Sequence, residues 1–158
     1  MSIYTLQQIQ KIPAPIHTVW EFISSPYNLK LITPEYMGFE VLTEDLPEKM
    51  YPGMIITYKV RPLLNIPMTW VTEITHVRDF EFFVDEQRVG PYKLWHHQHH
   101  LKEIDGGVLM TDIVNYQAPF GLFGKTFNPI LIKPKLDDIF SYRRRKVEEL
   151  YGAQSIKK

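Results

Sequence analysis

Four of the six histidines in this chain lie close together, between His96 and His100, and an aspartate follows them in a second strand-like run. The dipeptide Asp105-Gly106 separates the two runs, and Asp-Gly is the strongest short signal for a two-residue hairpin turn. With the turn at this place, His99 lies opposite Asp112, and His97 shares their face because side chains alternate along a strand. Imidazole and carboxylate groups so arranged can move protons, hold a metal ion or bind the polar end of a ligand.

The rest of this face is apolar, which identifies it as the inner face of the hairpin. The opposite face begins with His96, Gln98 and His100 and is more polar. Polar side chains on an apolar face are costly unless each has a partner. The apolar members of the inner face are Trp95, Leu101, Met110, Val114 and Tyr116.

Three interpretations of the polar group follow. His97, His99 and Asp112 match the residue types of a two-histidine, one-carboxylate metal site, but their spacing is not a diagnostic motif, and we expect no metal and no cofactor. We expect the two histidines to line a pocket and to meet polar groups of a ligand. For Asp112, a structural pair with His99 and a functional role both remain open, the latter being acid–base chemistry of the cyclase or dehydratase type.

The elements that must position the hairpin follow one another in a simple order. A strand is expected at residues 3–12, a helix from Pro15 through Ile23, and a second short helix from Pro26. Alternating patterns then predict strands at residues 39–43, 54–61, 66–77 and 80–87. Charged residues 85–88 are interpreted as a solvated strand end in which Arg88 pairs locally.

The C-terminal region changes to helical spacing. We expect a helix over residues 135–151, and Pro129 and Pro134 predict a kink or break, so that two helical pieces form. The basic run 143–146 is interpreted as a solvated helical face. The apolar residues that set the period are Leu136, Ile139, Phe140, Val147 and Leu150.

Size and composition limit the classes of protein. The chain has 158 residues, 18 basic and 18 acidic side chains and no cysteine. We expect one domain over residues 1–152 with a frayed tail at 153–158, and no attraction to nucleic acid. Disulfides, thiolate metal sites and a cysteine nucleophile are excluded, and no serine lies in a Gly-x-Ser-x-Gly context. No run resembles a signal peptide or membrane span, so a cytoplasmic protein without membrane insertion is expected.

Sequential strands followed by one amphipathic helix predict an α+β fold, in which a curved antiparallel sheet of about seven strands wraps around the C-terminal helix. This order resembles the START-like helix-grip superfamily, also called SRPBCC. It is most similar to the bacterial ligand-binding branch grouped with coenzyme-Q-binding and polyketide-cyclase-like proteins. The resemblance implies a deep apolar cavity for lipid-like, isoprenoid, quinone or polyketide molecules. The residues that carry it are Val19-Trp20-Glu21-Phe22-Ile23, Gly90-Pro91-Tyr92, Trp95-His96-His97 and Thr111-Asp112-Ile113-Val114.

We therefore expect a protein that binds a hydrophobic or amphipathic small molecule between the sheet and the C-terminal helix. The alternative is a cyclase- or dehydratase-type enzyme that uses His99 and Asp112 in the same cavity. The sequence leaves the oligomeric state open. The predicted ligand contacts are Tyr58, Met68, Trp70, Trp95, His97, His99, Met110, Asp112, Tyr116, Phe123, Phe127, Ile139 and Phe140.

Overall fold

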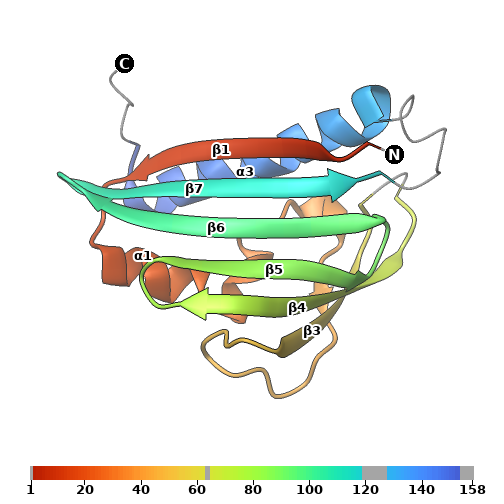
Figure 1. Cartoon of the computed structure of the whole chain (residues 1–158), viewed down its shortest axis with the longest axis horizontal. Helices are drawn as coiled ribbons and strands as arrows, with labels where there is room; N and C mark the ends of the chain where they lie inside the picture. The colour runs from red at the N-terminus through yellow and green to blue at the C-terminus, as the bar shows by residue number, and fades with distance from the viewer. Residues whose placement is uncertain (1, 63–64, 119–127, 154–158) are drawn as a thin grey trace.

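The computed structural model describes residues 2–62, 65–118 and 128–153. Seven strands form one sheet in the order β1-β7-β6-β5-β4-β3-β2, and all neighbouring strands are antiparallel. Neighbours in the sheet are neighbours in sequence, except that β1 pairs with β7 (Figure 1). The predicted fold class is confirmed. The strands are β1 (Tyr4–Ile12), β2 (Glu40–Val41), β3 (Met54–Val60), β4 (Met68–Arg78), β5 (Phe82–Val89), β6 (Leu94–Ile104) and β7 (Gly107–Gln117).

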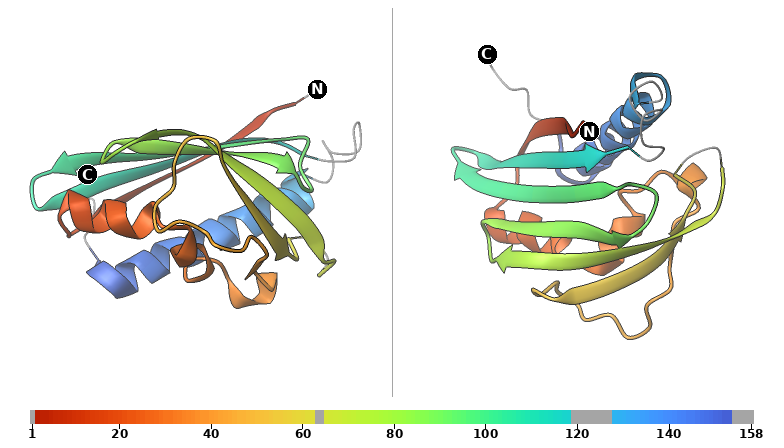
Figure 2. Two further views of the ribbon diagram at one scale, coloured as in Figure 1. Left: turned by 90° about the horizontal axis from the view of Figure 1, so that it is seen from below. Right: turned by 45° about the vertical axis from the view of Figure 1, so that its right-hand side comes forward.

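The helices cover one face of the curved sheet. Figure 2 shows α1 and α3 on the same side of the strands, with α3 running along the sheet. Helix α1 contacts β6 and β7, and α3 contacts β1. The helical elements are α1 (Ile16–Ile23), the 3₁₀ turns η1 (Pro26–Lys30) and η2 (Glu35–Met37), the π-helical turn η4 (Asn128–Ile132) and α3 (Lys133–Tyr151).

The hairpin of β6 and β7 has the predicted register. Ile104 pairs with Gly107 and His99 with Asp112. Gly106 has a φ of 77°, which suits glycine in the two-residue turn. A Cβ at Gly107 would lie 2.1 Å from the carbonyl oxygen of Ile12, so only glycine lets β1 approach the hairpin this closely.

Two buried clusters fill the space between sheet and helices. One surrounds α1 and includes Val19, Trp20 and Ile74. The other lies under the first turns of α3 and includes Trp70 and Leu136. Apolar residues of both clusters also line the pocket described below, so the pocket lies where the two clusters meet.

The bounds of several strands and of the C-terminal helix differ from those expected from sequence. The strand expected at residues 39–43 is two residues long, and Phe80 lies in the turn before β5 with a φ of 64°. No break separates two helical pieces, because η4 leads directly into α3. Pro134 lies in the first turn of α3, where the N–H that proline lacks is not needed. Apart from Ala153, the predicted tail 153–158 is outside the described residues.

Across the described ranges, the structure contains no helix that is long and apolar enough to span a membrane.

Candidate ligand-binding pocket

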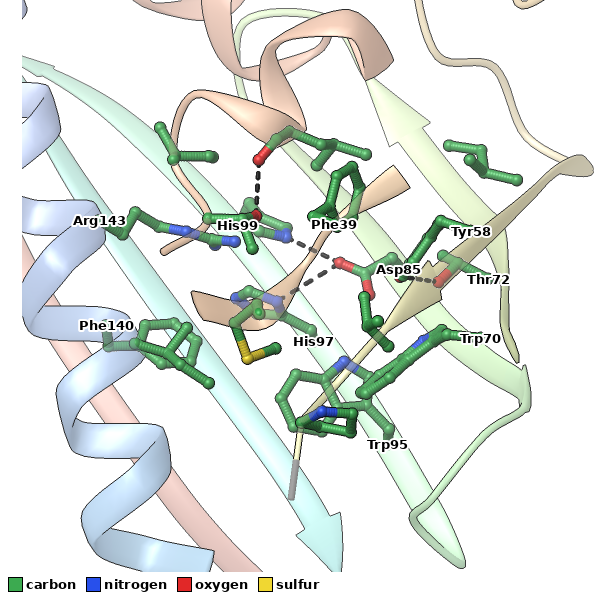
Figure 3. Close-up of a pocket in the computed structure, with 18 of the residues that line it drawn as sticks. Phe39, Tyr58, Trp70, Thr72, Asp85, Trp95, His97, His99, Phe140 and Arg143 are labelled. Atoms are coloured by element: carbon green, nitrogen blue, oxygen red, sulfur yellow. Dashed lines mark hydrogen bonds and ion pairs between the residues drawn. The ribbon is translucent and has the colours of Figure 1, made fainter. Parts of the chain in front are cut away.

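A cavity of about 130 Å³ lies between the inner face of the sheet and α3 (Figure 3). Strands β3 to β7 supply one wall, α3 supplies the opposite wall, and residues from α1 to η2 contribute to the rest. Most of the lining is apolar, with a polar group in the middle strands. The aromatic lining residues are Phe39, Tyr58, Trp70, Phe83, Tyr92, Trp95 and Phe140.

The pocket brings together many of the predicted ligand contacts. Met68 is only half-buried and does not line the cavity, and Tyr116 packs instead in the core against Tyr4 and Tyr92. Phe123 and Phe127 lie outside the described residues. Contact with a ligand stays a prediction for the eight residues that do line the cavity: Tyr58, Trp70, Trp95, His97, His99, Met110, Ile139 and Phe140.

Two histidines and two aspartates form a closed polar group, here called the His–Asp ring (Asp85, His97, His99 and Asp112). His99 Nε2 lies 2.8 Å from Asp85 Oδ2, and its Nδ1 lies 2.8 Å from Asp112 Oδ1. His97 Nε2 lies 3.1 Å from the same Asp112 oxygen, and its Nδ1 lies 3.4 Å from Asp85 Oδ2. His99 therefore bridges both carboxylates, whereas the hydrogen bond of His97 is to Asp112.

Asp112 contacts both histidines of this ring. The predicted pairing with His99 is present, but Asp112 also accepts a hydrogen bond from His97. It is 4% exposed and is not among the residues that line the cavity. The carboxylate contacts two imidazoles that do line the cavity, and its own contact with a ligand stays a prediction.

The two imidazoles have opposite protonation preferences. Burial, together with the neighbouring charge of His99, lowers the pKa of His97 to about 4. Burial opposes the charged form of His99 as well, but its hydrogen bonds to Asp112 and Asp85 outweigh this, and its pKa is raised above the usual value. The distances agree, since both nitrogens of His99 approach carboxylates more closely than those of His97 do.

Both carboxylates remain ionised near neutral pH. Burial would raise the pKa of Asp112, but hydrogen bonds from His97 and His99 prevail and hold it well below its usual value. The pKa of Asp85 is also lowered, because the two histidines and Arg143 outweigh its burial. The ring therefore contains two carboxylates and a neutral imidazole at His97, and His99 is the imidazole that holds a proton more readily.

Asp85 is a site residue that the interpretation of residues 85–88 as a solvated strand end misses. It pairs across the sheet with His97 and lines the pocket. Its alternation with Phe83, which is 3% exposed, is the sequence signal that could have placed it on the inner face. Arg88 does pair locally as expected, with Glu86 and with Glu73 of the neighbouring strand.

Arg143 is a second missed residue and corrects the interpretation of the basic run 143–146 as a solvated face. It lines the pocket from α3 and points toward the His–Asp ring (Figure 3). Its position follows the helical spacing of Leu136, Phe140 and Val147, all of them buried. Arg145 in the same run is exposed.

Asp85, His97 and His99 also form a group that could hold a metal ion, because one ligand atom from each lies within 4.8 Å of the others. The carboxylate of this group is Asp85 rather than the Asp112 considered from sequence. The same nitrogen and oxygen atoms already contact one another in the His–Asp ring, and a metal ion would have to replace those contacts.

We keep the expectation that no transition metal binds, as a prediction. Elemental analysis of protein purified without a chelator should find no zinc, iron or nickel near one equivalent per chain. A near-stoichiometric metal that disappears in His99→Ala and persists in His96→Ala, on the opposite face of the same strand, would contradict this.

The single antiparallel sheet, the C-terminal helix packed on it and the pocket between them define the START-like helix-grip fold, as the sequence predicted. The chain is similar to protein CV1439 from Chromobacterium violaceum, with a TM-score of 0.69 and 15% identity over 96% of this chain and 99% of that one. Protein Ms6760 from Mycobacterium smegmatis matches with a TM-score of 0.66 and 19% identity over 95% of this chain and 96% of that one. Ginseng major latex-like protein 151 from Panax ginseng matches with a TM-score of 0.65 and 12% identity, covering 94% of this chain and 97% of that one. No family model matches the sequence, and no curated protein matches it.

Proposed function

We propose that this protein binds a hydrophobic or amphipathic small molecule in the pocket between the sheet and α3. The observation that carries the proposal is the cavity itself, which has aromatic and aliphatic walls and a small number of polar groups gathered in one part. Ligand pockets in proteins commonly combine an apolar lining with a few placed polar groups. The resemblance to the START-like superfamily implies the same class of function.

The side chains that line the pocket offer a ligand two kinds of contact, apolar and polar. Trp70, Trp95 and Phe140 offer flat apolar surface to the body of a ligand, and the rings of Trp70 and Trp95 are nearly perpendicular to each other. His97 and His99 lie on the neighbouring part of the sheet and offer polar contact. A ligand with an apolar body and one polar group matches both.

Mass spectrometry of organic extracts tests the proposal on protein purified under native conditions. We expect a small molecule to be released from the wild-type protein. Ile139→Trp, which fills the pocket from a half-buried position on α3, should lose it. Ser141→Trp adds the same bulk at an exposed position on the same helix and should retain it. Equal yields from both variants would place the molecule elsewhere and contradict the proposal.

A second candidate, an acid–base enzyme of the cyclase or dehydratase type, is favoured by one observation. Two adjacent imidazoles that prefer opposite protonation states line the same cavity, and such pairs supply an acid and a base at one pH. The pair that would act is therefore His99 as the acid and His97 as the base, in place of the His99 and Asp112 considered from sequence. Conversion of the extracted molecule to a dehydrated product, lost in His99→Gln while binding persists, would establish this activity.

A further inference from the structure

The pocket contains buried polar atoms for which the described part of the chain provides no hydrogen-bond partner. Arg143 Nε and Nη1 are buried and have no hydrogen-bond partner among the described residues. Trp70 Nε1 is in the same state, and Trp70 is 7% exposed. Both side chains line the pocket, and all three atoms are N–H donors.

Acceptor atoms of the pocket lining already have protein partners at two places. Asp85 Oδ2 receives His99 Nε2 at 2.8 Å and lies 3.4 Å from His97 Nδ1. Tyr58 and Thr72 share a hydrogen bond of 2.6 Å between their hydroxyl oxygens. Within the described residues, the unpaired polar capacity of the buried lining atoms is therefore donor capacity, and part of it belongs to the charged guanidinium of Arg143. A ligand that matches it must supply acceptors, which an ammonium group cannot do.

We propose that the ligand of this pocket is a compact carboxylic acid whose carboxylate binds the guanidinium of Arg143. The proposal rests on the pocket being a ligand site and adds the chemical class of the ligand. A guanidinium matches a carboxylate in geometry as well as charge, because two parallel N–H groups meet two oxygens. The indole N–H of Trp70 provides a further donor for a second acceptor on the same molecule.

The body of the ligand is limited by the size of the cavity. At about 130 Å³ it is close to the ~150 Å³ engineered cavity that admits benzene, so its volume suits about one ring. The ring of Phe140 lies 5.2 Å from the guanidinium carbon of Arg143, and further aromatic side chains line the same pocket. A single aromatic or alicyclic ring carrying a short carboxylate arm fits this shape.

The His–Asp ring makes Arg143 decisive for selectivity. That ring contains two carboxylates, one of which, Asp85, lines the pocket, so without Arg143 the polar part of the pocket would repel an anion. Removal of the guanidinium should therefore do more than weaken the binding of an acid. It should reverse the preference between an acid and the matching neutral alcohol.

Isothermal titration calorimetry with 3-phenylpropanoate and 3-phenylpropan-1-ol, at neutral pH, tests the inference. Wild-type protein should bind the acid about tenfold or more tightly than the alcohol, as a charged hydrogen bond contributes. In Arg143→Gln the alcohol should bind as tightly as the acid or more tightly. Arg145→Gln removes the same charge at an exposed position two residues along α3 and should keep the wild-type preference.

The outcomes separate this inference from the proposed function. Equal binding of acid and alcohol by wild-type protein would contradict the inference that the ligand is a carboxylic acid. The proposal that the pocket binds a ligand would still stand. If neither compound binds and no molecule is released on extraction, both the carboxylic-acid inference and the proposed ligand-binding function are contradicted. If Arg143→Gln does not fold, Arg143→Lys provides the test, because it keeps the charge but loses the paired N–H geometry. It should then show a smaller preference for the acid than wild type, and an undiminished preference would overturn the paired contact.

Discussion

Replacement of Asp112 by asparagine is expected to lower the free energy of unfolding by about 3–5 kcal/mol at neutral pH, as the loss of one partner from a buried ion pair does. Asp112 is 4% exposed, and one of its oxygens contacts both imidazoles of the His–Asp ring. Asparagine keeps the shape but removes the negative charge that stabilises the imidazolium of His99. The pKa of His99 should fall as a consequence, because Asp112 contributes to raising it.

Urea denaturation gives the stability change, and the matched control is Glu103→Gln. Glu103 is exposed on the same hairpin, so the same charge change should alter stability by no more than about 0.5 kcal/mol. A loss in Asp112→Asn as small as that of the control would mean that the carboxylate is not the counter-ion of the buried imidazoles.

The second large effect is a fall in stability as the pH decreases from about 6.5 to about 4, on the order of 3 kcal/mol. The folded-state pKa of His97 is lowered from 6.5 to about 4. In this window the unfolded chain binds a proton at His97 that the folded protein does not, so acid favours unfolding. Asp85 and Asp112 affect stability only at lower pH. Their folded-state pKa values are lowered, so the stability that they contribute is fully present above their unfolded pKa and is lost as the pH falls through the folded values.

His99 acts in the opposite direction. Its folded pKa is raised, so its contribution to stability is fully present below its unfolded pKa and is lost as the pH rises through the folded value. Together, the two histidines predict a stability maximum near pH 6.5. Denaturation at a series of pH values should show that His97→Gln flattens the acid limb, whereas His96→Gln on the opposite face leaves it in place. An unchanged acid limb in His97→Gln would contradict the assignment.

The part of the site that lies on the β6–β7 hairpin could be predicted from sequence, because a single turn determines how the two strands pair. The Asp105-Gly106 turn sets the register of the whole hairpin, and alternation then places His97, His99 and Asp112 on one face. The apolar spacing of the C-terminal helix likewise predicts which of its faces meets the sheet. Local signals were sufficient in both cases, since each depends on residues close in sequence.

The positions of Asp85 and Arg143 could not be predicted in this way, because they depend on contacts between segments that are distant in sequence. The partner of Asp85 is set by the register of β5 against β6, whose connection carries no two-residue turn signal, and β4 shifts its register against β5 in two places. The mixed charges around Asp85 and the basic run around Arg143 each resemble solvent-exposed sequence. Only the curvature of the sheet over α3 shows that both side chains face one cavity.

Contacts between distant segments also explain why Asp112 lies on the inner face without lining the cavity. Register puts it on the inner face, but it cannot show whether an inner side chain faces a cavity or the back of its neighbours. Here the carboxylate contacts the imidazoles of His97 and His99, which do line the cavity. A residue can therefore be correctly assigned to a face and still not line the cavity.

The most direct test of the pocket as a ligand site uses the indole N–H signals of the three tryptophans in an NMR titration. Trp70 and Trp95 line the pocket, whereas Trp20 is buried in the cluster around α1 and does not. With signals assigned through Trp70→Phe and Trp95→Phe, 3-phenylpropanoate should shift both pocket signals along one saturable curve and leave Trp20 in place. Saturable binding that shifts Trp20 alone, or that leaves Trp70 and Trp95 unchanged, would contradict the account.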